Sequence, residues 1–476
     1  MVGKPTTIGH FTKRATVLAM SSGGVTFWAK ALMMIAIVAV SPLRALAHGD
    51  PDHPEVSANV ELWGPLISEL SPHAFAVHVG AVDGKSRTAT LRVDDATERR
   101  SNAASALRSV VSPAAVWHTL RVDGLLPGRR YRYQLVVEGL AALGGELTTA
   151  PPLGDSRPVL LAVFGDEQAS PNNDSVSSRS IIQAVLAESP DLVIGTGDLV
   201  GEGGSEADWR ELSKTHGPLW SQLLYVPALG NHELIGDSDA SFFRKLLPQA
   251  ASRFYAVRFG FVQLIFLDGN RPGSREQTHF LATELKKSES DPAVRAKLVV
   301  LHQPPLSMGL HCGTSSSMHE WMLLFERYHV DAVLAGHDHA YERLERNGVP
   351  YFVSGGGGAK LYDQSPCGEP DEPALQRYES AHHYVMIELR PLADRVAVSV
   401  RAQAPQGLPF DRVSLPIARS SIGTLQLDSA NRGPPRRFHR GHLRYILRHH
   451  GLQLGVALLF GVVIVAAWRY GRRRSP

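Results

Sequence analysis

Five short polar motifs occur in order along the chain, and their side chains are those that bind hard or borderline metal ions. They are Gly165-Asp-Glu-Gln168, Gly197-Asp-Leu-Val-Gly201, Gly230-Asn-His-Glu233, Leu301-His-Gln-Pro304 and Gly336-His-Asp-His339. Singly, each has an ordinary explanation, because Gly-Asp is a common turn and a lone histidine after a strand is usually a hydrogen-bonded structural group. Together, five loops that deliver Asp, Asn and His predict convergence on metal ions such as iron, zinc or manganese.

Each motif follows an apolar run of the length expected for a buried strand. Residues 159–164, 192–196, 298–301 and 332–335 are such runs, and residues 177–188 and 318–328 have helical spacing between them. Residues 383–415 return to strand-like alternation and are expected to complete a sheet of the same domain. The pattern predicts an α/β (α+β) β-sandwich flanked by helices over residues 157–415, with its function at the carboxyl ends of the strands.

Residues 52–150 consist of short alternating segments separated by polar or glycine-containing turns, which predicts a separate all-β sandwich. Residues 118–137 resemble the strand, proline turn and Tyr-x-Tyr strand of fibronectin type III domains, in which a tyrosine fixes a corner between the sheets. Either Tyr131 or Tyr133 would take that position. A spacer, or a wall beside the active site, is favoured over a ligand-binding module.

The ordered motifs resemble those of the calcineurin-like metallophosphoesterases, and together with the preceding β-sandwich they are most similar to purple acid phosphatase-like proteins over residues 56–415. The resemblance implies a metallophosphoesterase β-sandwich with a dinuclear centre, in which Asp198 bridges two divalent or trivalent ions (Fe, Zn or Mn). It implies that Asp166 and His339 bind the first metal, and that Asn231, His302 and His337 join Asp198 on the second. His232 would orient the phosphate and protonate the leaving oxygen.

Two departures from the family pattern concern the first metal. Purple acid phosphatases have a tyrosine where this chain has Gly201, and many other members have a histidine where it has Gln168, so Gln168 is at most a weak ligand. His311, Asp338, Glu233 and Glu167 receive no catalytic role on sequence grounds. The run Ser354-Gly-Gly-Gly-Gly-Ala359 lacks the spacing of a phosphate-binding P-loop and is expected to let the backbone turn tightly beside the motifs.

The function that these residues imply is hydrolysis of phosphate monoesters by a metal-activated hydroxide, without a protein nucleophile. One alternative is a phosphodiesterase or nucleotide pyrophosphatase with the same centre. The other is a non-catalytic surface binding protein with a degenerate site, which Gln168 and Gly201 would favour. The survival of all six other predicted ligands favours the enzyme.

The two ends of the chain predict export and a membrane anchor. Residues 1–47 contain basic residues, no acid and an apolar run before Ala45-Leu-Ala47, which favours a signal peptide cleaved after Ala47 over an uncleaved anchor. Residues 416–450 read as a basic linker, residues 451–468 as a transmembrane helix, and residues 469–476 as a basic tail. A sorting tail removed after export is the alternative. The expected location is the cell membrane, single-pass, with the catalytic domain on the extracytoplasmic side.

Charge and cysteine content limit the partners. Residues 432–476 hold ten arginines and no acidic residue, so the net charge of +3 conceals an acidic body and argues against nucleic-acid binding. The expected partners are a small phosphate ester and, through residues 451–468, the membrane. The two cysteines, Cys312 and Cys367, would either form a disulfide or remain two separate buried thiols.

Overall fold

The computed structural model describes residues 61–96, 108–140, 142–173, 176–313, 317–365, 374–393 and 395–418. The predicted signal peptide (1–47), transmembrane helix (451–468) and basic tail lie outside these ranges, as does the predicted linker beyond residue 418. Within the ranges described, no helix combines the length and apolar character needed to cross a membrane.

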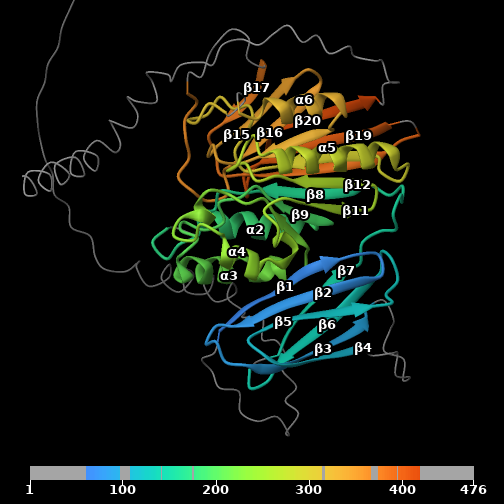
Figure 1. Cartoon of the computed structure of the whole chain (residues 1–476), viewed down its shortest axis with the longest axis vertical. Helices are drawn as coiled ribbons and strands as arrows, with labels where there is room; N and C mark the ends of the chain where they lie inside the picture. The colour runs from blue at the N-terminus through green and yellow to red at the C-terminus, as the bar shows by residue number, and fades with distance from the viewer. Residues whose placement is uncertain are drawn as a thin grey trace, which may run out of the picture.

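The N-terminal part is a β-sandwich of two antiparallel sheets, drawn in blue to cyan in Figure 1. Its strands are β1 (Leu62–Leu70), β2 (Ala74–Ala81), β3 (Arg87–Asp95), β4 (Arg108–Ala115), β5 (Trp117–Asp123), β6 (Arg130–Val137) and β7 (Leu143–Thr148). One sheet has the order β1-β2-β5 and the other β4-β3-β6-β7. In β5 and β6 buried and exposed residues alternate, as expected for strands with one face in a core and one in water.

The structure decides between the two tyrosines of the predicted corner. The hydroxyl of Tyr131 accepts a hydrogen bond from the backbone N–H of Leu126, five residues upstream, at 2.9 Å. The hydroxyl of Tyr133 instead donates to the carbonyl of Ser221, in the following domain, at 2.8 Å. Tyr131 therefore fixes the turn within the sandwich, and Tyr133 attaches the sandwich to its neighbour.

The second domain is built on two sheets that pack face to face. The first has the order β10 (Tyr225–Pro227), β9 (Leu192–Gly195), β8 (Val159–Phe164), β18 (Tyr384–Pro391), β19 (Arg395–Gln403) and β20 (Pro409–Ala418). The second has the order β11 (Tyr255–Phe259), β12 (Val262–Phe266), β13 (Ala296–Val300), β14 (Ala332–Ala335), β16 (Val349–Ser354), β15 (Tyr341–Arg346) and β17 (Ala374–Glu379). Residues 384–418 thus join β8 in the first sheet, in agreement with the strand pattern of the sequence.

Helices cover the outer faces of both sheets (Figure 1). They are α2 (Val176–Glu188), α3 (Glu206–Trp220) and α4 (Ser241–Leu246) on the first sheet, and α5 (Arg275–Ser290) and α6 (His319–Arg327) on the second. Two 3₁₀ turns, η1 (His232–Leu234) and η2 (Pro248–Ala250), lie in the connections. Ser205 and Ser274 cap α3 and α5 by accepting a hydrogen bond from a first-turn N–H.

Three packed clusters of apolar side chains hold the layers together. The inner faces of the two sheets share one core, and each outer face shares another with its helices. Because β8, β9, β13 and β14 are buried on both faces, their sequences are apolar, apart from Lys297 in β13, rather than alternating. This explains why the sequence reveals these four strands so clearly.

The N-terminal sandwich packs against α3 and α4 (Figure 1). Trp63 contacts Phe242 edge to face, with ring centroids 5.1 Å apart, and lies nearly parallel to Trp117. The Nε2 of His78 donates to the carbonyl of Lys245 at 3.0 Å. Packed aromatic rings and hydrogen bonds to backbone carbonyls therefore fix the two domains relative to each other.

Candidate metal centre

The predicted ligands lie at one end of the two sheets because parallel strands deliver them. The strand β9 is parallel to β8 and β10, and β13 is parallel to β14. Asp166 and Asp198 follow β8 and β9, while His302 and His337 follow β13 and β14. The carboxyl ends of parallel strands meet at one edge of a sheet, which brings residues more than a hundred positions apart into one site.

Several site residues adopt a backbone conformation that non-glycine residues avoid. The φ angles of Asp166, Asp198 and His337 are 61°, 54° and 72°, and that of Gln168 is 45°. Such left-handed conformations cost free energy and persist where the surrounding structure imposes them, often at functional sites. The hydrogen bonds around the site supply that constraint, because Asp166 accepts the backbone N–H of His337 at 2.9 and 3.0 Å.

The predicted second metal site is a compact cluster of three side chains. Ligand atoms of Asp198, His302 and His337 all lie within 4.8 Å of one another. The Nε2 of His302 is 3.2 Å from Oδ2 of Asp198 and 3.0 Å from Oδ1 of Asn231, so the fourth predicted ligand adjoins the cluster. Two nitrogens and two oxygens at this spacing fit the coordination shell of a transition metal.

The predicted first metal site is built around Asp166 and His339. The Nε2 of His339 is 3.5 Å from Oδ1 of Asp166, and both side chains are buried. Asp198 lies close enough that its charge raises the pKa of Asp166, in addition to the larger effect of burial. Two buried carboxylates at one place favour a cation between them.

The remaining ring nitrogens show how the histidines are held. Nδ1 of His302 donates to the carbonyl of Thr196 at 2.8 Å, and Nδ1 of His339 donates to the carbonyl of Lys360 at 2.7 Å. A backbone carbonyl can only accept, so each ring turns Nε2 toward the site. Metal-binding histidines have this arrangement, in which the second nitrogen donates to a fixed acceptor.

The charges of the site also suit a cation. Burial lowers the pKa of His339 to about 4, which leaves the neutral imidazole that a metal requires. Burial acts in the same direction on His302, but the carboxylates of Asp198 and Asp166 outweigh it and raise the pKa of His302 to about 10. The site therefore attracts positive charge. A metal ion would compete with the proton of His302 for the same carboxylates.

The amide nitrogen of Gln168 points toward two histidines of the site. Its Nε2 lies 3.0 Å from Nε2 of His232 and 3.5 Å from Nε2 of His339. Nδ1 of His232 donates to the carbonyl of Gly201 at 2.6 Å, so in the neutral ring Nε2 accepts from Gln168. In this arrangement Gln168 is a hydrogen-bond donor to His232 rather than an oxygen ligand.

A side chain at Gly201 would meet a buried carboxylate. A Cβ atom on Gly201 would lie 2.9 Å from Oδ2 of Asp208, a buried carboxylate that accepts the backbone N–H of Glu202. At the position of the family's tyrosine, a larger residue would therefore have to displace the Asp208 carboxylate.

His232 lies at the rim of the site. Its backbone N–H donates to Oδ1 of Asp198 at 2.9 Å, and its Nε2 is 3.8 Å from Oδ2 of the same residue. The ring remains partly exposed while the predicted metal ligands Asp166, Asp198 and His302 are buried. This position agrees with a group that contacts substrate rather than metal.

A second histidine at the rim, His311, has no role in the sequence interpretation. Its Nδ1 lies 2.9 Å from Oδ1 of Asp338, and its ring stacks on that of His337 with centroids 4.0 Å apart. The ring of Tyr362 contacts two histidines of the site. It stacks on the ring of His339, with centroids 4.1 Å apart, and lies edge-on to the ring of His311, with centroids 5.7 Å apart. His311 lies nine residues after His302 and does not directly follow a strand. The local sequence therefore gives no strong indication that it belongs to the site.

Glu233 supports the loops instead of facing substrate. It is fully buried and accepts the backbone N–H groups of Leu199 and Gly230, both at 2.7 Å, and that of Asp198 at 3.1 Å. Burial raises the pKa of Glu233 to about 7. The side chain thus joins the second and third motifs.

The glycine-rich run 354–359 lies directly behind the first motif, as the sequence suggests. The backbone N–H of Gly357 donates to the carbonyl of Gly165 at 2.8 Å, and that of Ala359 to the carbonyl of Asp166 at 2.8 Å. A Cβ on Gly355 would lie 2.2 Å from the carbonyl oxygen of Asp338. The glycines therefore allow close backbone packing beside the first and fifth motifs.

Cys312 is disulfide-bonded. Its predicted partner, Cys367, lies outside the described residues, so the pairing stays a prediction.

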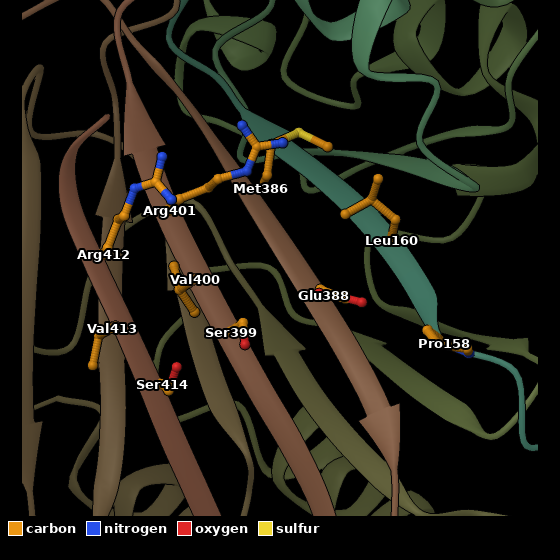
Figure 2. A pocket seen from close by; sticks show the side chains of 10 residues that line it. All are labelled: Pro158, Leu160, Met386, Glu388, Ser399, Val400, Arg401, Arg412, Val413 and Ser414. Carbon is orange, nitrogen blue, oxygen red and sulfur yellow. The ribbon is translucent and has the colours of Figure 1, made fainter. Parts of the chain in front are cut away.

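A groove of about 540 Å³ lies along the outer face of β8, β18, β19 and β20, away from the strand-end loops (Figure 2). Its lining combines Arg401 and Arg412 with Glu388, two serines and apolar side chains, and it includes none of the predicted metal ligands. Arg401 is held by Glu188 through two hydrogen bonds of 2.8 and 2.6 Å. The groove is thus separate from the metal centre.

Comparison with known proteins identifies the domain that carries the site. Residues 161–341 match the calcineurin-like phosphoesterase family. The chain is 28% identical over 278 residues to purple acid phosphatase 23 of Arabidopsis thaliana, covering 49% of this chain and 58% of that protein. It is 26% identical over 275 residues to an uncharacterised protein of Mycobacterium tuberculosis, covering 47% and 49%. The chain thus spans about half the length of these relatives.

Solved structures show the same fold at low sequence identity. Purple acid phosphatase PPD1 from seeds of yellow lupin, Lupinus luteus, aligns with a TM-score of 0.60 and 15% identity over 77% of each chain. PhoD aligns with a TM-score of 0.52 and 12% identity, over 76% of this chain and 92% of that one. The first alignment covers more of the chain than the phosphoesterase match alone, so the shared fold extends beyond residues 161–341.

Proposed function

The chain contains a calcineurin-like phosphoesterase domain with purple acid phosphatase homologues, and from this premise we propose that it hydrolyses phosphate monoesters at a dinuclear metal centre. Asp166, Asp198 and His339 would hold one ion, and Asp198, Asn231, His302 and His337 the other. The observation that carries the proposal is the orientation of His302 and His339, whose Nδ1 atoms are fixed on backbone carbonyls so that Nε2 faces the carboxylates.

Two metal ions in this site would supply a nucleophile from water and neutralise charge on the phosphate oxygens. The ions would be iron, zinc or manganese, since the donors are carboxylate, amide oxygen and imidazole. Among the motif residues no serine or cysteine lies beside a histidine base, so no protein nucleophile is invoked.

The two rim histidines would handle the leaving group and the phosphate. His232 presents Nε2 at the site while Nδ1 is fixed on the carbonyl of Gly201, so in its protonated form it would donate from Nε2 to a phosphate oxygen. The carboxylate of Asp338 holds Nδ1 of His311, an arrangement that orients the imidazole of catalytic histidines in many enzymes. We assign His311 as a proton donor to the leaving oxygen and His232 as a phosphate contact, which divides between two residues the roles that the sequence prediction gives to His232 alone.

The proposal is tested by metal content and turnover on residues 48–431 purified without chelator. Elemental analysis is followed by hydrolysis of p-nitrophenyl phosphate and bis(p-nitrophenyl) phosphate with added Mn, Zn or Fe. We expect about two metal ions per chain and faster hydrolysis of the monoester than of the diester. Faster diester turnover would replace monoesterase by phosphodiesterase, and metal binding without turnover of either ester would favour the non-catalytic alternative.

We further propose export and tethering, with the catalytic domain on the extracytoplasmic side. The supporting observations are the signal-like residues 1–47, the apolar run 451–468 and the disulfide-bonded state of Cys312, since disulfides persist in oxidising compartments. Membrane fractionation of the full chain and of a chain ending at residue 431 tests this. Full chain that fractionates as a soluble protein would refute the anchor.

A further inference from the structure

Behind the predicted metal ligand Asn231 lies a continuous series of polar side chains that the mechanism above does not use. Nε of Arg253 lies 2.6 Å from Oδ2 of Asp268, which is fully buried. Oδ1 of Asp268 accepts from the amide nitrogen of Asn270 at 2.9 Å. Oδ1 of Asn270 accepts from Nε2 of Gln303 at 2.9 Å, and the same Nε2 lies 3.4 Å from Oδ1 of Asn231.

The direction of this series is set at Asn270. The amide nitrogen of Asn270 has three neighbours that can only accept, the Asp268 carboxylate and the carbonyls of Gly230 at 3.1 Å and Leu229 at 3.5 Å. Asn270 must therefore turn its nitrogen to them and its oxygen to Gln303. Gln303 must in turn present Nε2, because its own oxygen would face the oxygen of Asn270.

Gln303 shows that this direction is imposed on it. Its Oε1 is buried and has no hydrogen-bond partner within the described part of the chain. A buried polar atom without a partner costs free energy, so the orientation of the amide is set by the contacts of Nε2, which faces the oxygens of Asn270 and Asn231. Asn270 and, through it, the carboxylate of Asp268 impose that orientation.

We propose that this relay, Arg253–Asp268–Asn270–Gln303, selects which atom of the Asn231 amide faces the metal. The two ends of an amide have nearly the same shape, but only the oxygen binds a cation. Gln303 donates toward Oδ1 of Asn231, and that oxygen lies 3.0 Å from Nε2 of His302, within the predicted second metal site. Asn270 and Gln303 are thus positioning residues, and this inference rests on the proposed dinuclear site.

A double-substitution experiment distinguishes steering of the amide from a general structural role. Gln303→Met removes the donor at similar volume, and Asn231→Asp replaces the amide by a carboxylate, which presents oxygen in either orientation. Apoprotein of the wild type, both single variants and the double variant is titrated with Co²⁺, following stoichiometry, dissociation constants and visible absorption. The matched control is Gln263→Met, which changes a different buried glutamine, located on β12.

Gln303→Met is expected to weaken one of the two Co²⁺ sites about 10- to 100-fold, as for other partners of metal ligands. In the Asn231→Asp background the same substitution should change affinity by less than about threefold, and Gln263→Met should have no effect in the wild type. Equal losses in both backgrounds, or no loss in the wild type, would overturn the relay. Two bound Co²⁺ without turnover would refute the proposed activity alone, whereas a wild type that binds no Co²⁺ would overturn both.

Discussion

The imidazole of His311 lies nearly parallel to that of His337, with ring centroids 4.0 Å apart and an angle of 28° between the planes. His337 is a predicted metal ligand, whereas His311 is fixed at the rim by Asp338, whose other oxygen accepts from the hydroxyl of Ser307. A histidine held by a carboxylate is thus placed one ring away from the predicted second metal.

His311→Gln should reduce turnover in a way that depends on the leaving group. A proton donor contributes about 10²-fold or more when the leaving oxygen is basic, and little when it is a good leaving group. We expect a fall in kcat of about 100-fold on alkyl phosphates and a much smaller fall on p-nitrophenyl phosphate, with metal content unchanged. His319→Gln, an exposed histidine at the start of α6, is the control. Equal losses on both esters would contradict the assignment.

Asp198→Asn should abolish binding of at least one metal and lower turnover by about 10³-fold or more, because it removes the charge that the two sites would share. The substitution keeps the shape of the side chain, so circular dichroism should still report a folded protein. Elemental analysis checks the metal content. Asp239→Asn, which removes an exposed carboxylate in a nearby loop, should change neither quantity; full metal content in Asp198→Asn would disprove the bridging role.

Gly201→Tyr should not restore the tyrosine ligand of purple acid phosphatases. The new side chain would begin 2.9 Å from Asp208, so we expect destabilisation of about 1–3 kcal/mol and no visible Fe(III)–tyrosinate absorption. Thermal unfolding and the visible spectrum of the iron-loaded variant measure both. Gly217→Ala, in α3 with open space around it, should be neutral or stabilising. A purple, stable Gly201→Tyr protein would show that the loop adapts.

The boundary between the two domains should make stability depend on pH through His78. Burial lowers the pKa of His78 from 6.5 to about 4, and Nε2 is committed to the carbonyl of Lys245. Between pH 4 and pH 6.5 His78 binds a proton in the unfolded chain but not in the folded chain. The contribution of neutral His78 to the free energy of unfolding is therefore complete above pH 6.5 and is lost as the pH falls toward 4. Its size is about 3 kcal/mol.

His78→Gln keeps a donor toward Lys245 and removes the titration. The difference in Tm between pH 7 and pH 5 should therefore shrink in His78→Gln relative to the wild type. The exposed His319→Gln again serves as the control, and it should keep the full wild-type difference. An unchanged pH dependence in His78→Gln would show that His78 is not a source of the effect.

The sequence by itself determined the candidate metal ligands and the strands that precede them. Residues 159–164 and 332–335 are predicted strands with the same bounds as β8 and β14, because strands buried on both faces must be apolar throughout. The polar motif after each strand is equally local. Residue type and position relative to a strand end are properties of short segments, which is why they can be read without the fold.

Only the tertiary structure decided which polar groups face one another. His311 and Asp338 are separated by 27 positions, and Gln168 and His339 by 171, yet each pair meets at the site. The sequence also left Tyr131 and Tyr133 open, and the packing of α3 separates them by giving Tyr133 the carbonyl of Ser221. Such pairings depend on how two sheets and their loops pack, and the orientation of an amide or imidazole depends on acceptors that distant segments supply.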